Sequence, residues 1–335
     1  MFENESVLIT GGTGSFGRKF VEVALQKCRP RRLIVFSRDE LKQHEMRRHF
    51  PEAGDSPMRY FIGDVRDGER LHRAFRDVDV VVHAAALKQV PACEYNPFEA
   101  VQTNILGAKN VIDAAIDSGV KKVMAISSDK AVNPVNLYGA TKLCAEKLFV
   151  QGNSYAGSTG ARLACCRYGN VVASRGSVVP VFLEQRKTGT ITITDRRMTR
   201  FWLTLEQGVS FVLHCIERMQ GGEIFVPKVP SMKVAAIARL LAPECRVKYV
   251  GIRPGEKLHE VLISKDEAGR TLETKDMFII QPAFSWWSAP KRKGAKRVKD
   301  GFSYTSDGNR QWWDDRAFLK LVHDCTSEKA DGTRP

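Results

Sequence analysis

Short apolar runs alternate with longer segments of helical spacing along the first half of the chain. The apolar runs predict strands at residues 6–10, 32–36, 59–62, 79–83, 122–127 and 161–168. The segments between them predict helices at residues 15–27, 39–49, 99–117 and 136–149. Apolar strands that alternate with helices are typical of a parallel sheet covered on both faces. We therefore predict an α/β fold, with a doubly wound parallel sheet of the Rossmann type.

This rhythm changes after about Val172. Shorter β-like runs such as residues 190–194 follow, then a helix over 205–219 and turns that contain prolines. The change predicts a smaller C-terminal lobe that covers the substrate. We divide the chain into a nucleotide-binding domain at 1–172, a mainly substrate-binding lobe at 173–284 with some segments returning to the first domain, and a C-terminal extension at 285–335.

The composition is that of an ordinary globular protein, with 43% hydrophobic and 27% charged residues in 335. No apolar run approaches the roughly 20 residues that a membrane-spanning helix needs. The N-terminus is acidic and lacks the basic start of a signal peptide, so we expect a cytoplasmic protein with no membrane partner. Eight cysteines without metal-ligand spacing predict reduced, packed thiols and no metal site.

The net charge of +14 indicates an anionic partner. A nucleic acid is one candidate, and a phosphorylated cofactor with a nucleotide-linked substrate is another. The densest basic run lies at residues 291–299. We interpret it as a solvated loop rather than a polyanion-binding tail, and we expect no nucleic acid partner.

A glycine-rich turn follows the first predicted strand and opens the first predicted helix. Its glycines allow a tight turn and a close approach of the backbone, and the helix N-terminus favours a pyrophosphate. In this context the turn predicts a dinucleotide site. The candidate contacts are Gly11, Thr13, Gly14, Ser15, Phe16 and Gly17.

The end of the second predicted strand selects the dinucleotide. An acidic residue there binds the ribose 2′-hydroxyl of NAD, whereas an arginine favours the 2′-phosphate of NADP. The strand ends in Ser37 and Arg38, with Lys42 one helical turn later, so we predict NADP rather than NAD. The alternative is that Arg38 is a surface charge and Asp39 holds the ribose. Asp64 either accepts from the adenine amino group or caps a turn.

Tyr138 and Lys142 are four residues apart, so a helix places them on one face. An ammonium beside a phenol lowers the pKa of the phenol, which makes Tyr138 a candidate base near neutral pH. Lys142 can also hold a ribose. The alternative is an ordinary pair on a helix surface.

Asp129 and Lys130 form a second acid–base pair directly after the fifth predicted strand. A simple alcohol oxidation needs only the first pair. Two pairs suggest redox chemistry coupled to a second proton transfer, such as an elimination. A surface ion pair at a strand end is the alternative, but the four residues together favour a catalytic site.

These motifs resemble those of the extended short-chain dehydrogenase/reductase superfamily. The glycine-rich turn, the run from His83 to Ala86, Thr103-Asn104 and the Tyr-x-x-x-Lys pattern carry this resemblance. From about residue 5 to 282 the chain is most similar to the inverting UDP-N-acetylglucosamine 4,6-dehydratases (5-epimerases) of pseudaminic acid biosynthesis. The matching motifs are TGGTGSFG (10–17), SRDE (37–40), AALKQVPACEYNP (85–97), SSDKAVNPVNLYGATK (127–142), RYGNVVASRGSVVP (167–180), MTRFW (198–202) and RPGEKLHE (253–260).

The resemblance implies a lyase reaction and further contacts. Retaining dehydratases usually carry Asp-Glu after the fifth strand, so Asp129-Lys130 implies Lys130 as the base at C5. Asp129 then protonates the leaving C6 hydroxyl, Tyr138 takes the C4 hydroxyl proton and Ser128 bonds the C4 oxygen. Burial and Lys142 would have to lower the pKa of Lys130, while the pKa of Asp129 would have to rise.

The remaining implied contacts are to the cofactor, to the substrate and to other copies of the chain. Further cofactor contacts are Val65, Ala84, Ala85, Lys88 and Asn104. Contacts to a UDP-linked amino sugar are Lys88, Asn170, Val178, Arg200, Arg253 and Glu256, since arginine grips phosphate with a planar fork. His83 and His259 are interpreted as structural, and a homo-oligomer is expected.

Two alternatives stay open at this point. One is a retaining 4,6-dehydratase or a 4-epimerase of a nucleotide sugar on the same scaffold. The other is a non-catalytic protein that senses a dinucleotide or binds a polyanion. The two acid–base pairs argue against the second, because a sensor has no need of them.

Overall fold

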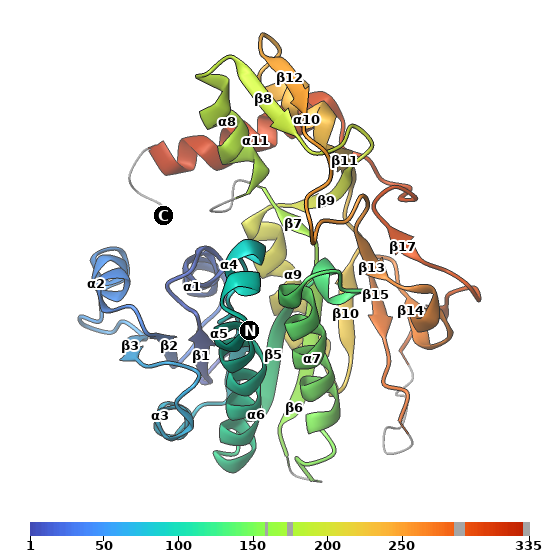
Figure 1. Cartoon of the computed structure of the whole chain (residues 1–335). Helices are drawn as coiled ribbons and strands as arrows, with labels where there is room; N and C mark the ends of the chain where they lie inside the picture. Colours follow the sequence, from blue (N-terminus) through green and yellow to red (C-terminus); the bar gives the residue numbers. More distant parts are fainter. Residues whose placement is uncertain (158–159, 173–176, 285–291, 331–335) are drawn as a thin grey trace.

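A large, mostly parallel sheet forms the centre of the molecule (Figure 1). The computed structural model describes residues 1–157, 160–172, 177–284 and 292–330. Within them the sheet has the strand order β16-β14-β15-β10-β6-β5-β4-β1-β2-β3. The parallel strands are β1 (Ser6–Thr10), β2 (Arg32–Ser37), β3 (Met58–Ile62), β4 (Val80–His83), β5 (Lys122–Ser128), β6 (Arg162–Tyr168) and β10 (Ile224–Pro227). The predicted doubly wound α/β fold is confirmed.

Helices cover both faces of this sheet, because its strands are apolar on both sides. Helix α1 packs against α9, and α6 packs against α3 and α7. The helices are α1 (Ser15–Lys27), α2 (Glu40–His49), α3 (Gly68–Ala74), α4 (Val90–Tyr95), α5 (Pro97–Val101), α6 (Gly107–Asp117), α7 (Leu137–Gly152) and α9 (Leu205–Arg218).

The helix predicted at 99–117 is not continuous. A π-helical segment, η1 (Gln102–Leu106), lies between α5 and α6, and the Gly107 N–H bonds the Gln102 carbonyl oxygen. Such π segments are rare and occur often at functional sites. This one contains Asn104, whose side chain supports the loop after β4.

A second hydrophobic core holds the smaller lobe together. It joins Phe182 of α8 (Val178–Arg186), Ile237 of α10 (Val234–Leu241) and Phe318 of α11 (Asp315–Ala330). Its strands are β7 (Asn170–Val171), β8 (Thr190–Ile193), β9 (Thr199–Leu203), β11 (Ser231–Lys233) and β12 (Arg246–Tyr249). The last helix of the chain is therefore part of this lobe (Figure 1).

The chain after β10 returns to the large sheet, as the division of the sequence allowed. Antiparallel strands β15 (Met277–Ile280), β14 (Thr271–Glu273) and β16 (Lys296–Arg297) extend its edge. A further pair, β13 (Val261–Ile263) with β17 (Tyr304–Thr305), lies next to the short helices η2 (Asp129–Ala131) and η3 (Lys265–Arg270). Residues 292–330 are thus integrated into the fold.

The basic run at 291–299 is more structured than a solvated loop. Lys291 lies outside the described residues, whereas Arg292 pairs with the buried carboxylate of Glu223. Lys296 and Arg297 form the exposed edge strand β16. Cations on an edge strand oppose pairing with another chain. Among the described helices, none has the length and apolar character that crossing a membrane requires.

Candidate active site

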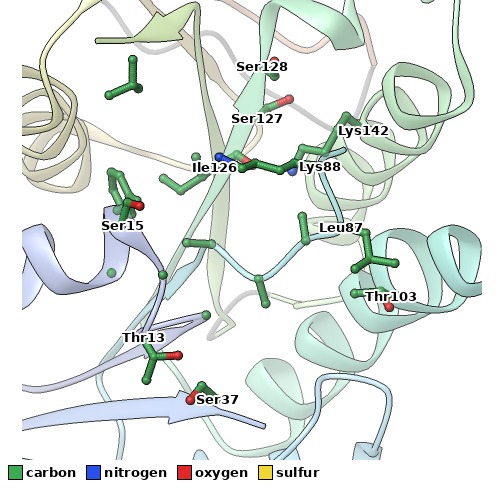
Figure 2. A pocket seen from close by; sticks show the side chains of 18 of the residues that line it. Thr13, Ser15, Ser37, Leu87, Lys88, Thr103, Ile126, Ser127, Ser128 and Lys142 are labelled. Atoms are coloured by element: carbon green, nitrogen blue, oxygen red, sulfur yellow. The ribbon is translucent and has the colours of Figure 1, made fainter. Parts of the chain in front are cut away.

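A cavity of about 710 Å³ runs along the carboxyl ends of the parallel strands. In Figure 2, Thr13 and Ser37 lie at one end of it and Ser128 at the other, with Lys88 and Lys142 between them. Twenty of the predicted site residues line it: Gly11, Thr13, Gly14, Ser15, Phe16, Gly17, Ser37, Arg38, Lys42, Asp64, Val65, Ala84, Ala85, Lys88, Ser128, Asp129, Lys130, Tyr138, Lys142 and Asn170. This is where ligands bind in open α/β sheets.

The glycine-rich turn leaves room for a close-lying anion. Gly11 has φ +66°, and a Cβ there would lie 2.9 Å from the backbone of Ala85. A Cβ at Gly17 would lie 2.4 Å from the Gly12 carbonyl oxygen. Gly14 caps α1 without a side-chain bond, so the first amides of this helix face the cavity unblocked. These residues fit the pyrophosphate of a dinucleotide.

The far end of the cavity carries opposite charges. Arg38 lies half-exposed, with Nη1 3.6 Å from Oδ2 of Asp64. Asp64 also accepts from the backbone N–H and the guanidinium of Arg66, so it has the turn-capping role weighed as an alternative. Burial would raise the pKa of Asp64, but Arg66 and Arg38 hold it below its usual value. Lys42 pairs with Asp39, the cap of α2, instead of facing the cavity unpaired.

Asn104 does not line the cavity, and its role as a cofactor contact stays a prediction. Its Nδ2 donates to the Leu87 carbonyl and to Thr141 Oγ1, both at 2.9 Å, and its Oδ1 accepts from the Leu87 N–H at 2.8 Å. The amide is therefore fully used in fixing the loop that follows β4. That loop carries Lys88, which lines the cavity and whose pKa burial lowers.

Helix α7 packs closely against the turn that contains Asp129 and Lys130. Asn136 caps the helix by accepting from the Gly139 N–H at 2.7 Å. A Cβ at Gly139 would lie 2.3 Å from the Lys130 carbonyl oxygen, so only glycine fits there. This close approach places Tyr138 beside Asp129 and Lys130 at one end of the cavity.

The predicted effect of Lys142 on Tyr138 is wrong in this structure. Lys142 Nζ donates to the Ile126 carbonyl oxygen at 2.5 Å, and burial lowers the pKa of this lysine. Burial raises the pKa of Tyr138 to about 12, although the charge of Lys130 and a hydrogen bond with Ser128 oppose the rise. The cation that assists the phenol is therefore Lys130.

Asp129, which is buried, and Lys130, which is half-buried, form an ion pair with a third partner. Lys130 Nζ lies 3.1 Å from Asp129 Oδ1 and 3.1 Å from Glu260 Oε1. Ser128 Oγ donates to Asp129 Oδ1 at 2.7 Å. Burial raises the pKa of Asp129, which is the predicted direction. The predicted fall for Lys130 is wrong: burial alone would lower its pKa, but Asp129 and Glu260 outweigh it and raise the pKa to about 12.

Arg200 lies outside the cavity lining, and its role as a diphosphate contact stays a prediction. Its guanidinium donates to the backbone carbonyls of residues 199, 257 and 258 at 2.7–3.1 Å. Its Nε also lies 3.3 Å from Oε1 of Glu260. Arg200 is thus a buried residue that holds Glu260 in place. Glu260 was missed by the sequence reasoning, and its place at the end of the 253–260 motif is the one signal that could have pointed to it.

The other predicted substrate contacts divide. Asn170 lines the cavity, whereas Val178, Arg253 and Glu256 do not. Arg253 has an exposed side chain whose Nη1 lies 3.9 Å from Glu256 Oε1. Their role as nucleotide contacts stays a prediction.

The two histidines singled out have structural environments. His83 Nδ1 shares a hydrogen bond of 2.8 Å with Thr10 Oγ1, and burial lowers its pKa to about 3. His259 Nδ1 makes an equal bond with Thr199 Oγ1. Within the described residues the cysteines are unbridged and no cluster of metal-ligating side chains occurs.

Known proteins are similar to this chain in both sequence and fold. Residues 7–282 match the family described as polysaccharide biosynthesis protein. A Campylobacter jejuni protein named UDP-N-acetylglucosamine 4,6-dehydratase (inverting) is 54% identical over 333 residues, which cover 96% of this chain and 98% of the relative. A Rickettsia canadensis protein named UDP-glucose 4-epimerase is 41% identical, covering 84% of each. The X-ray structure of Pen from Bacillus thuringiensis has a TM-score of 0.89 at 38% identity and covers 97% of this chain and 99% of its own.

Proposed function

This chain belongs to the polysaccharide biosynthesis protein family, and from that premise we propose that it removes water from UDP-N-acetylglucosamine across C5 and C6 and inverts C5. It is an inverting 4,6-dehydratase of the extended short-chain dehydrogenase/reductase type. One observation supports this reading above the others: the buried Asp129 and the half-buried Lys130 are in contact and lie beside Tyr138, in a cavity with a dinucleotide cradle. The product would be a UDP-2-acetamido-2,6-dideoxy-4-keto-L-hexose.

The cofactor is a nicotinamide dinucleotide, and we propose NADP over NAD. Gly11, Gly14 and Gly17 would hold its pyrophosphate, and Arg38 would hold the 2′-phosphate. When bound, the nicotinamide accepts a hydride from C4 of the sugar and returns it to C6, so no external reductant is consumed.

Replacing Arg38 by glutamine should separate the two dinucleotides. A hydrogen bond to a charged group contributes about 1.5–3 kcal/mol, so NADP should bind about 10- to 100-fold more weakly while NAD changes little. Titration calorimetry with each dinucleotide measures this. Arg47→Gln is the matched control, because Arg47 pairs with Glu52 and does not line the cavity. Equal losses for NAD and NADP in Arg38→Gln would contradict the assignment.

The protein's own groups supply the proton transfers. Tyr138 would take the C4 hydroxyl proton as the phenolate, the form that burial disfavours and the charge of Lys130 favours. The ketone formed at C4 would then acidify the C5 proton. Lys130 removes that proton, and Asp129 gives a proton to the C6 hydroxyl, which leaves as water. Moving one proton from Lys130 Nζ to the Asp129 carboxylate, 3.1 Å away, would create this base and this acid together. Inversion follows when a proton returns to C5 on the opposite face.

The surroundings of the reaction are also part of the proposal. We propose that the 4-keto sugar serves pseudaminic acid biosynthesis and that the chain works as a homo-oligomer. The motifs shared with the inverting dehydratases support both statements. Lys88 and Asn170, which line the cavity, would contact the sugar nucleotide.

Proton NMR of one reaction tests the function. The purified protein is incubated with NADP and UDP-N-acetylglucosamine in D₂O. A new C6 methyl signal is expected, and it should lack the splitting by a C5 proton because C5 carries deuterium, in the L configuration. The D configuration would indicate a retaining dehydratase. A C4 epimer that keeps its C6 hydroxymethyl group would indicate the activity in the name of the Rickettsia relative, and salt-dependent binding to DNA without turnover would indicate a polyanion-binding protein.

A further inference from the structure

Glu260 lies directly behind the proposed catalytic pair without lining the cavity. Its side chain is only 3% exposed, and Oε1 is 3.1 Å from Lys130 Nζ. Lys130 Nζ therefore lies between two carboxylates, Asp129 on the cavity side and Glu260 behind. A carboxylate at this depth is costly unless it is paired, so its position calls for an explanation.

The backbone of Glu260 is held as tightly as its side chain. Its N–H donates to Ser306 Oγ at 2.9 Å, and its carbonyl accepts from the Ser306 N–H at 2.8 Å. Ser306 Oγ also bonds Thr199, the residue before Arg200, at 2.7 Å. The Glu260 side chain is thus held by Arg200 of β9 and its backbone by the segment after β17, two parts of the chain distant in sequence.

A purely structural carboxylate would use both of its oxygens. Glu260 Oε1 contacts both Lys130 and Arg200, at 3.1 and 3.3 Å. Glu260 Oε2 is buried and has no hydrogen-bond partner among the described residues. Leaving a buried acceptor unsatisfied costs free energy of folding. The arrangement favours a role in placing charge beside Lys130 over a role in stability.

The charge of Glu260 acts on both members of the pair. Burial would raise the pKa of Glu260, but Lys130, Arg200 and Lys257 lower it, so this carboxylate stays ionised. Burial is the main cause that raises the pKa of Asp129. The charge of Lys130 lowers this pKa, and the charge of Glu260 raises it further. It also raises the pKa of Lys130. A fixed anion thus favours the protonated form of the acid and of the base alike.

We propose that Glu260 is a positioning residue for the dehydration: it holds the Lys130 side chain against Asp129 and supplies a permanent negative charge that keeps one shared proton on this pair. The inference rests on the proposed function, because it assigns Asp129 and Lys130 to the elimination. Glu260 itself touches neither cofactor nor substrate in this proposal.

The pH dependence of the reaction follows from the groups that face the pair. These are Glu260 and Lys257 from the 253–260 segment, Arg200 of β9, Tyr138 of α7 and Ser128 of β5. The active form carries one proton on the Asp129–Lys130 pair, so kcat should be lost when a second proton binds and when the last one leaves. Tyr138 responds to Lys130 and Asp129, whereas Glu260 is not among the charges that shift it.

Glu260→Gln removes the charge while keeping the shape. Without the anion both protons bind less tightly, so both limbs of the kcat–pH profile should move to lower pH by about one unit or more. KM for UDP-N-acetylglucosamine should change less than about threefold, because Glu260 lies outside the cavity. Glu260→Asp, which keeps the charge on a shorter side chain, should lower kcat but leave both limbs near the wild-type pH.

Glu267→Gln is the matched control, because Glu267 is a buried carboxylate of the same region that pairs with Arg167 instead of Lys130. It should reduce thermal stability without moving the pH profile. An unmoved profile in Glu260→Gln would overturn the inference, and so would failure of both Glu260 variants to fold, which would make Glu260 a structural residue. If the wild-type protein did not convert the sugar nucleotide, the proposed function would fail first, and the two failures are thus distinguishable.

Discussion

Lys130→Ala is expected to lose water elimination and C5 exchange, with kcat reduced by about 10²–10⁴-fold. The reason is that Lys130 is the amine that contacts Asp129, and Tyr138 is committed to the C4 hydroxyl proton. Incubation in D₂O with NMR detection of the C6 methyl group and of deuterium at C5 measures both losses.

The oxidation at C4 should become slower but survive in the same variant, because Tyr138 remains while the cation that lowers its pKa is lost. Reduced nicotinamide should therefore accumulate after substrate is added, and its absorbance reports it. Lys109→Ala is the control, since this exposed lysine pairs only with Asp113 on the surface of α6. Deuterium at C5 appearing at the wild-type rate in Lys130→Ala would show that another group is the base.

Arg167→Leu should be the most destabilising single substitution that we propose. Arg167 lies at the end of β6, 1% exposed, with two bonds to Glu146 of α7 and two to Glu267 of η3. The variant leaves two buried carboxylates without their cation. Breaking a buried pair in this way costs about 3–5 kcal/mol of the free energy of unfolding.

Urea unfolding at pH 7 measures this loss, with Arg186→Leu as the control. Arg186 pairs with Glu244 on the surface, where the same change should cost less than about 1 kcal/mol. The deficit of Arg167→Leu should shrink as the pH falls, because the stranded carboxylates become neutral by binding protons. The wild-type protein should instead lose stability on acidification. Burial would raise the pKa of Glu267, but Arg167 keeps it low, so the free energy that this ion pair contributes is lost when Glu267 binds a proton. A deficit below about 1 kcal/mol would contradict the argument.

The parallel half of the fold could be predicted from the sequence because its signals are local. The strand at Ser6–Thr10 is apolar throughout, and the helix at Ser15–Lys27 follows a glycine turn at the distance that a dinucleotide fold requires. Tyr138 and Lys142 share a helix face because of their spacing alone. These features depend on neighbours only a few residues away.

The charge environment of the site could not be predicted in this way. Glu260 is 130 positions from Lys130 in the chain, so no local pattern links them. A glutamate in a segment that contains lysine and histidine is also typical of the surface. Arg200 is of a residue type that often binds phosphate, yet its guanidinium N–H groups donate to backbone carbonyl oxygens. The pKa of Tyr138 depends on burial, which spacing along a helix does not reveal.

The bond between Ser306 and Glu260 has a consequence for how the enzyme matures. Residues proposed to touch cofactor or sugar all precede position 257, yet the support behind Lys130 is completed only when Ser306 docks between Thr199 and Glu260. A chain synthesised only as far as β15 would contain the residues that are proposed to react. It would lack the Ser306 hydrogen bonds that hold the backbone of Glu260 behind Lys130. The segment around Ser306 must therefore be synthesised and folded before Glu260 is held in this position.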